Sequence, residues 1–252
     1  MDKRFDGQVA IVTGSSRGIG YGIAERLVSE GAQVCLTARK DGPLDEAVEA
    51  LGGADRALGV AGKADDPDHQ ADTVARTLDT FGRVDMLVNN TGINPAYGPL
   101  VDLDHGVARK TFEVNALGAL SWVQQVHRAW MAEHGGTVLN VASVAGKRPA
   151  PHIGFYGATK AMLLSITQQL ALELGPDIRV NALAPAVVKT RFATALYEGK
   201  EEDVAASYPL KRLGAPDDIS GAAAFLLSEA DAGWVTGQTL VLDGGLTLTG
   251  GV

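Results

Sequence analysis

Ser143, Tyr156 and Lys160 bring a hydroxyl, a phenol and an amine together just after an apolar run at residues 137–142. Tyr156 and Lys160 are four residues apart, so the helix predicted at residues 155–174 places them on one face. A phenol ordinarily keeps its proton up to about pH 10, and an ammonium group one turn away favours the phenolate and lowers that pKa. With a hydroxyl to hold a substrate oxygen, the set predicts proton transfer to a carbonyl or from an alcohol. The pattern alone is also compatible with an ordinary pair on an amphipathic helix.

A glycine-rich stretch lies between the first predicted strand, residues 8–13, and the first predicted helix, residues 17–30. Gly14 permits a tight turn, Gly18 lets the backbone approach a pyrophosphate, and Gly20 lets the helix pack close to the sheet. The unpaired N–H groups at the start of the helix favour an anion there. The spacing G-x-x-x-G-x-G in this context predicts a dinucleotide site, the alternative being a tight turn with no ligand. The other turn residues expected to contact the cofactor are Ser16, Arg17 and Ile19.

The residues after the second predicted strand, residues 32–37, indicate which dinucleotide binds. NAD-binding proteins commonly place an acid there, on the ribose 2′-hydroxyl, whereas this chain has Ala38 followed by Arg39 and Lys40. Arg39 and Arg17 are both candidates to bind a 2′-phosphate, which a guanidinium group grips with two hydrogen bonds. The chain is therefore expected to favour NADP(H), with NAD(H) possible. The alternative is that Arg39 and Lys40 are solvated loop charges.

Composition excludes several other classes of protein. The chain has 252 residues, 46% of them hydrophobic, and a formal net charge of -8 from 22 basic and 30 acidic residues. Without a block of basic residues, nucleic-acid and membrane-surface partners are not expected. Cys35 is the only cysteine, so no internal disulfide, no cysteine zinc site and no metal are predicted. Because the sequence shows no signal segment, no apolar run of about 20 residues and no peroxisomal ending, the cytoplasm is the expected location.

Short apolar runs alternate with helical periodicity along the whole chain. The strands are predicted at residues 8–13, 32–37, 57–62, 86–89, 137–142, 178–183 and 239–242, and the helices at residues 17–30, 44–51, 67–81, 105–130, 155–174 and 217–228. Continuous runs of valine, leucine and isoleucine are typical of parallel strands buried on both faces. The expected fold is a single Rossmann-type α/β domain over residues 1–252, a doubly wound parallel sheet with helices on both faces. Residues 185–212 form the least regular stretch and are interpreted as a substrate loop.

Taken together, the motifs resemble those of the short-chain dehydrogenase/reductase family over nearly the whole chain. The matching segments are residues 13–20 (TGSSRGIG), residues 89–92 (NNTG), Asn115, the set of Ser143, Tyr156 and Lys160, residues 181–185 (NALAP) and residues 234–245 (WVTGQTLVLDGG). Several independent motifs in the right order make chance agreement very improbable. The family members most similar to this chain include carbonyl reductases and 3-oxoacyl-carrier-protein reductases, and the sequence does not separate them.

The chain departs from the family pattern at three positions. Thr91 stands where the family usually has alanine, and a mild effect is expected. Ala186 stands where glycine usually follows Pro185, so the backbone there does not freely take a positive φ. The acidic residue that the family places near the adenine has one candidate here, Asp65.

The resemblance implies a mechanism in which Tyr156 transfers the proton, Ser143 positions the substrate oxygen and Lys160 holds the nicotinamide ribose and lowers the pKa of Tyr156. Asn115 is implied to orient a water molecule that links Lys160 to solvent. Thr190 is implied to hold the nicotinamide carboxamide, with help from the backbone of Val188. The remaining cofactor contacts implied by the motifs are Asn90, Gly92 and Pro185.

The substrate is expected between residues 93–97 and the loop at residues 185–212. The residues predicted to line its pocket are Asn94, Tyr97, Phe192 and Leu196. Because these segments are mostly apolar, a ketone with an apolar or aromatic body is expected; the alternative is that the aromatic side chains cover the edge of the core or a subunit contact. The predicted function is an NADP(H)-dependent oxidoreductase that acts on a carbonyl or secondary alcohol. A homotetramer or homodimer is expected.

Two other functions are considered. One is an NAD-dependent alcohol dehydrogenase of the same family. The other is a non-catalytic dinucleotide sensor on the same fold, because a fold alone never proves chemistry. The sensor is disfavoured because such proteins commonly lose the tyrosine or the lysine, and this chain has Tyr156 and Lys160 together with Ser143 and Asn115.

Overall fold

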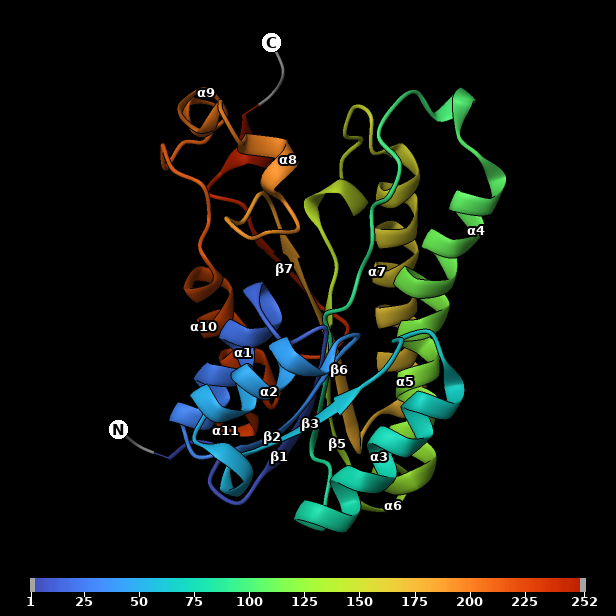
Figure 1. The fold of residues 1–252 in the computed structure, drawn as a ribbon, viewed down its shortest axis with the longest axis vertical. Coiled ribbons are helices and arrows are strands. Elements are labelled where there is room, and N and C mark those ends of the chain that lie inside the picture. Colours follow the sequence, from blue (N-terminus) through green and yellow to red (C-terminus); the bar gives the residue numbers. More distant parts are fainter. Residues whose placement is uncertain (1–2, 250–252) are drawn as a thin grey trace.

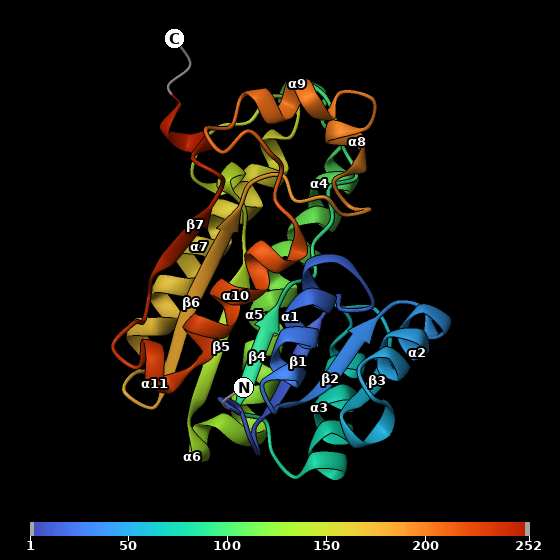
Figure 2. The same ribbon diagram turned by 90° about the vertical axis from the view of Figure 1, so that its left-hand side faces the viewer.

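A computed structural model describes residues 3–249, and within this range seven parallel strands form one sheet (Figures 1 and 2). The strands are β1 (Val9–Thr13), β2 (Gln33–Ala38), β3 (Ala57–Ala61), β4 (Met86–Asn89), β5 (Gly136–Val141), β6 (Ile178–Pro185) and β7 (Thr239–Leu242). Their order across the sheet is β3-β2-β1-β4-β5-β6-β7. The order reverses between β1 and β4, and in such sheets ligands bind at the carboxyl ends beside this switch point. The predicted doubly wound fold is confirmed.

Helices cover both faces of the sheet, as Figure 1 shows. On one face lie α1 (Gly18–Ser29), α2 (Asp41–Ala50) and α10 (Pro216–Leu227), and on the other lie α3 (Pro67–Phe81), α5 (Gly118–Val126) and α7 (Gly154–Leu174). Every residue of β1 and β6 is buried, which explains why their sequences are continuously apolar rather than alternating. Two apolar clusters, one for each face, pack these helices onto the sheet.

The helix predicted at residues 105–130 is longer and less regular than its sequence suggests. It consists of α4 (His105–Phe112), a π-helical turn (Glu113–Leu117), α5, a second π-helical turn (His127–Met131) and α6 (Ala132–His134). The side chain of Asp104 starts α4 by accepting a hydrogen bond from the backbone of Val107 at 2.9 Å. Side-chain periodicity near 3.6 does not reveal the single extra residue of a π-turn, and such turns are frequent at functional sites.

The structure also differs from the sequence prediction at residues 185–212 and at the start of α2. The predicted loop at residues 185–212 contains α8 (Thr194–Tyr197) and α9 (Glu201–Ala206), which lie above the carboxyl ends of the strands in Figures 1 and 2. Helix α2 begins at Asp41 instead of residue 44, because Pro43 is tolerated in a first helical turn. The small helix α11 (Glu229–Ala232) lies between α10 and β7. Within residues 3–249, no helix combines the length and the apolar character that crossing a bilayer requires.

Candidate active site and cofactor cleft

A cavity of about 1580 Å³ opens along the carboxyl ends of the strands. Typical small-molecule pockets measure roughly 300–1,000 Å³, so this one has room for a dinucleotide and a substrate together. The predicted residues that line it are Gly14, Ser16, Arg17, Gly18, Ile19, Arg39, Asp65, Asn90, Gly92, Asn94, Tyr97, Ser143, Tyr156, Lys160, Pro185, Val188, Thr190, Phe192 and Leu196. Gly20 and Asn115 lie behind the wall and do not line it.

The glycine turn forms one end of the cavity. Gly14 and Gly18 have φ angles of 64° and 63°, which side chains rarely adopt. The amide Nδ2 of Asn90 donates to the carbonyl oxygens of Thr13 and Gly14 at 2.9 and 3.0 Å, and this ties the end of β4 to the turn. A Cβ atom on Gly20 would lie 2.5 Å from that same Nδ2. Gly20 is thus required for close packing of α1, while Gly14 and Gly18 shape the turn.

Basic side chains surround the end of β2. Arg17 and Arg39 are both exposed and both line the cavity, and Ala38, the last residue of β2, directly precedes Arg39. Asp65 lines the same region and forms an ion pair with Lys110 of α4. Because Lys110 already neutralises this carboxylate, Asp65 adds little negative charge to this part of the cavity.

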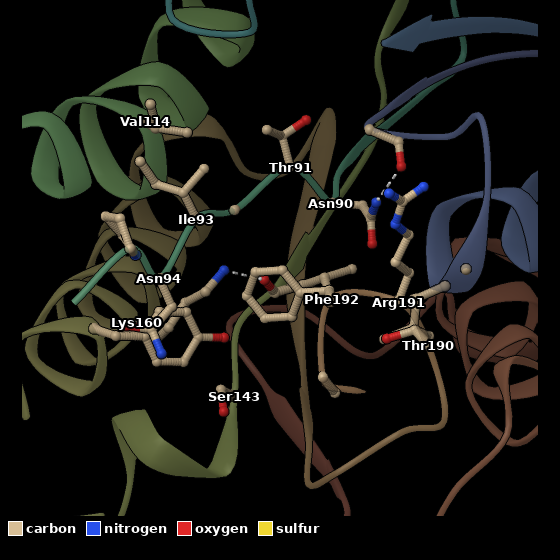
Figure 3. A pocket seen from close by; sticks show the side chains of 18 of the residues that line it. Asn90, Thr91, Ile93, Asn94, Val114, Ser143, Lys160, Thr190, Arg191 and Phe192 are labelled. Carbon is tan, nitrogen blue, oxygen red and sulfur yellow. Dashed lines mark hydrogen bonds between the residues drawn. The ribbon is translucent and has the colours of Figure 1, made fainter. Parts of the chain in front are cut away.

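Ser143, Tyr156 and Lys160 meet at the other end of the cavity, where β5 runs into α7. Lys160 is buried, and its Nζ donates to the carbonyl oxygen of Val141 at 2.8 Å, as the dashed line in Figure 3 marks. The same Nζ lies 5.8 Å from the centroid of the Tyr156 ring. The Oγ of Ser143 accepts a hydrogen bond from the backbone N–H of Ala145 at 3.1 Å, and this bond fixes the position of the hydroxyl.

Close approach of two backbones brings this group together. A Cβ atom on Gly157, beside Tyr156 in α7, would lie 2.6 Å from the carbonyl oxygen of Ala145. The loop that carries Ser143 therefore packs directly on the first turn of α7. The sequence interpretation did not include Gly157, although a glycine between Tyr156 and Lys160 is a signal of such close packing.

Burial dominates the electrostatics of the group. It raises the pKa of Tyr156 to about 12, and the Ser143 hydroxyl lowers this pKa only in part. Burial also lowers the pKa of Lys160 to about 8. The predicted lowering of the Tyr156 pKa by Lys160 is not seen in this structure, where desolvation raises that pKa and the Lys160 Nζ donates to the carbonyl of Val141. At neutral pH the phenol consequently carries its proton and the amine is mostly charged.

Asn115 lies in the π-helical turn and supports the cavity wall from behind. Its Oδ1 accepts from the backbone of Ile93 at 2.8 Å, and its Nδ2 donates to the Ile93 carbonyl at 2.9 Å and to the Thr159 hydroxyl at 3.1 Å. The side chain thus connects the loop after β4 to α7. A Cβ atom on Gly92 would lie 3.2 Å from the Lys160 Nζ and 3.6 Å from the Asn115 Oδ1, so Gly92 leaves space beside the lysine.

The substrate side of the cavity is aromatic. The ring of Phe192 lies 6.2 Å from that of Tyr156, measured between centroids. Tyr97 lies in the loop after β4 and His152 in the loop before α7, and the centroids of their rings are 5.0 Å apart. His152 has a φ of 66°, which is uncommon for a residue with a side chain and often marks a functional site. The sequence interpretation missed His152 and also Arg191. Arg191 lies inside the predicted substrate loop at residues 185–212, whereas His152 lies outside both pocket segments, between Ser143 and Tyr156.

One of the three departures from the family pattern, Ala186, proves harmless to the backbone. Among residues 3–249, only His152 and Lys211 combine a side chain with a positive φ, so Ala186 adopts a conformation that alanine tolerates. Its N–H donates to the carbonyl of Leu242 at 3.0 Å. The hydroxyl of Thr91 is buried beside Gly14 and has no hydrogen-bond partner within the described chain.

The cavity fits a dinucleotide on structural grounds. Gly18 lies next to Thr190, because a Cβ atom on Gly18 would be 3.3 Å from the Thr190 methyl group. A larger residue at position 18 would therefore fill the space between the glycine turn and Thr190. The N-terminus of α1 opens between these residues, and Arg17 adds positive charge there. Phosphates would bind at this end, and a nicotinamide ribose would lie beside Tyr156 and Lys160.

Comparisons with known proteins agree with this geometry. The family model described as enoyl-(acyl carrier protein) reductase matches residues 14–247. The chain is 40% identical to dehydrogenase/reductase SDR family member 4 of Caenorhabditis elegans, over 97% of this chain and 96% of that protein. It is 38% identical to short-chain dehydrogenase/reductase SDRA of Arabidopsis thaliana, over 98% and 97% of the two chains.

A solved structure gives the same result. The short-chain dehydrogenase/reductase from Brucella melitensis described as a glucose/ribitol dehydrogenase superimposes with a TM-score of 0.92 at 31% identity, covering 98% of this chain and 99% of that one. The chain therefore belongs to the short-chain dehydrogenase/reductase family and is an oxidoreductase that uses a nicotinamide dinucleotide.

Proposed function

We propose that the enzyme interconverts a ketone or other carbonyl and a secondary alcohol, with NADP(H) as the preferred cofactor. The observation that carries the proposal is the convergence of Ser143, Tyr156 and Lys160 at one end of a cavity whose other end is a glycine turn. When bound, the nicotinamide supplies or accepts the hydride at the substrate carbon. The protein supplies the geometry, the proton and the electrostatics.

Tyr156 is proposed to donate the proton to the carbonyl oxygen during reduction. Its raised pKa keeps the phenol protonated at neutral pH, so the proton is present to be donated, while a pKa this far above neutral weakens the driving force for its transfer. Ser143 would hold the same oxygen, and Lys160 would bind the nicotinamide ribose with the Nζ hydrogens that Val141 does not use. Asn115 would act by fixing the loop beside Gly92, through the hydrogen bonds that its amide makes with Ile93.

The preference for NADP(H) is proposed from the charges at the end of β2. Ala38 offers no carboxylate to the two ribose hydroxyls, and an acid there would repel a 2′-phosphate. Arg17 and Arg39 line the cavity nearby. A charged hydrogen bond contributes roughly 1.5–3 kcal/mol when well placed, and about 1.4 kcal/mol is a tenfold change in affinity. The alternative is an NAD-dependent alcohol dehydrogenase, in which these arginines point into solvent.

The test compares kcat/KM for NADP(H) and NAD(H) across a panel of ketones and secondary alcohols. The wild-type enzyme is expected to prefer NADP(H), and Ala38→Asp and Arg39→Ala should each shift the ratio toward NAD(H). Arg128→Ala, an exposed arginine outside the cavity, serves as the control and should leave the ratio unchanged. A wild-type preference for NAD(H), or no shift in either variant, contradicts the arginine argument. Absence of turnover with the whole panel would favour the non-catalytic sensor.

Phe192, Leu196, Tyr97 and Asn94 are proposed to form the substrate pocket, and their mostly apolar character favours an apolar or aromatic ketone. In this proposal residues 1–252 are one dinucleotide-binding domain, and residues 185–212 are its substrate loop. The lone cysteine, which is buried, suits a reducing compartment, and we propose the cytoplasm.

A homotetramer or homodimer is proposed as the working form. Large apolar side chains stand in solvent at Leu172 of α7 and at Trp234, just before β7. Exposed apolar groups of this size commonly mark protein contacts. Light scattering at micromolar concentration tests the assembly, and an isolated monomer would contradict it.

A further inference from the structure

Arg191 extends from the substrate loop into the cofactor side of the cavity. Its side chain is exposed and lines the cavity. In the view of Figure 3 the side chain of Arg191 extends toward the part of the cavity that Asn90 lines, and the Asn90 amide holds the glycine turn at Gly14. Among residues 3–249, no carboxylate forms an ion pair with Arg191. A guanidinium group free of carboxylates beside a glycine turn is well placed to bind a phosphate.

The side chain of Thr190, the residue before Arg191, lies against the glycine turn. The methyl group of Thr190 would lie 3.3 Å from a Cβ atom on Gly18, so the two segments are in van der Waals range. Gly18 is the first residue of α1, and the N-terminus of this helix favours an anion. Arg191 follows Thr190 directly and Arg17 precedes Gly18, so each of the two contacting segments carries one arginine that lines the cavity.

The next residue serves the other half of the cavity. Phe192 tilts by 44° against the ring of Tyr156 at 6.2 Å. In Figure 3 the side chains of Arg191 and Phe192 leave the backbone in different directions, toward Asn90 and toward Lys160 respectively. Arg191 and Phe192 are adjacent in the sequence, and their side chains thus reach the cofactor end and the substrate end of the cavity.

This segment lies between two anchored points of the chain. Before it, Val188 pairs with Gly214, and the Lys189 N–H donates to the Gly214 carbonyl at 2.8 Å. After it, the Tyr208 side chain is buried, and its hydroxyl accepts from the backbone of Val187 at 3.3 Å. Residues 190–207 form the intervening flap.

Thr190 is also hydrogen-bonded to the next part of the flap. Its carbonyl oxygen accepts from the hydroxyls of Thr194 and Tyr197, at 3.2 and 3.4 Å, so α8 is tied to Thr190. A contact that fixes residues 190–192 consequently fixes α8 over the substrate side as well.

We propose that Arg191 binds the diphosphate of the dinucleotide and that this contact fixes Phe192 against Tyr156, so that cofactor binding completes the substrate wall. The contact makes substrate binding depend on prior cofactor binding. The inference rests on the substrate site proposed above only for the role of Phe192. The diphosphate contact itself depends only on the dinucleotide that the family uses.

The first test measures binding of ADP-ribose and AMP by calorimetry, without substrate or turnover. ADP-ribose has both phosphates of the cofactor, whereas AMP lacks the phosphate on the nicotinamide side, which is the side from which Arg191 approaches. Arg191→Ala should weaken ADP-ribose binding by about tenfold and AMP binding by less than about twofold. Arg128→Ala should change neither affinity. Equal loss for both probes, or no loss for ADP-ribose, overturns the assignment.

The second test measures amide hydrogen exchange over residues 190–207. Saturating ADP-ribose should slow exchange in the wild-type flap by about fivefold or more, and should leave the flap of Arg191→Ala nearly unchanged. Equal protection in both proteins overturns the coupling to the flap. Arg191→Lys keeps the charge but loses the two-pronged geometry, so an intermediate affinity for ADP-ribose is expected. Because ADP-ribose carries neither nicotinamide nor 2′-phosphate, failure of this test is distinct from failure of the proposed reaction or of the NADP(H) preference.

Discussion

Replacing Lys160 by methionine should stabilise the folded protein at neutral pH while abolishing its activity. Lys160 is buried, and burial lowers its pKa from 10.5 to about 8. Each pKa unit corresponds to about 1.4 kcal/mol, so keeping the charged amine inside the fold costs about 3 kcal/mol at pH 7. The hydrogen bond to the Val141 carbonyl returns roughly 1.5–3 kcal/mol of this cost. Lys160→Met should therefore be more stable by about 1 kcal/mol, which raises Tm by about 2–4 °C in a chain of this size.

The sign of the effect reverses at high pH. The pKa of Lys160 is lower in the folded than in the unfolded state, so between about pH 8 and 10.5 the unfolded state binds more protons and wild-type stability rises with pH. At about pH 9.5 the wild type should have gained about 2 kcal/mol relative to Lys160→Met, and should then be the more stable of the two. Burying a charge at the site of chemistry is thus a cost in stability that function requires.

The assay is guanidinium chloride unfolding of both proteins at the two pH values and at one protein concentration. Lys200→Met is the matched control, because Lys200 lines the same cavity but is exposed, and it should change stability by less than about 0.5 kcal/mol. Parallel pH dependences for the wild type and Lys160→Met would refute the reasoning, since they would mean that the amine titrates alike in the folded and unfolded states.

Four further outcomes are expected. Tyr156→Phe should lower kcat by about 100- to 10,000-fold with cofactor Kd nearly unchanged, and more than a tenth of wild-type kcat would contradict the assignment. In the wild type, the rate of alcohol oxidation should rise with pH into the alkaline range, because the raised pKa of Tyr156 keeps the phenolate scarce at neutral pH; a flat profile of the chemical step would argue against this. Gly157→Ala should lower kcat at least about tenfold by pushing Ser143 away from Tyr156, whereas unchanged kinetics would show that the loop yields. Thr91→Val should raise stability by about 1 kcal/mol, because it removes a buried hydroxyl without a partner, and a lower Tm would reveal a partner for that hydroxyl.

Local pattern was enough to predict the architecture and most of the cavity lining. Continuous apolar runs indicated strands buried on both faces, and helical periodicity between them indicated the covering helices, because burial on a parallel sheet imposes these patterns directly. The four-residue spacing of Tyr156 and Lys160 placed both on one face of α7, which the structure bears out geometrically. The glycine turn was recognisable because positive φ at Gly14 and Gly18 strongly favours glycine.

Tertiary structure decided what depends on burial and on contacts between distant segments. The sequence predicted a lower pKa for Tyr156 from its neighbour Lys160, yet burial by the surrounding elements raises it, because desolvation of a charge is a property of the whole environment. The amide of Asn115 meets Ile93 only because a π-turn rotates the helix there, which no side-chain period records. Arg191 and Asn90 line the same cavity although they are about a hundred residues apart in the sequence, so only the folded chain brings a flap residue to this cavity.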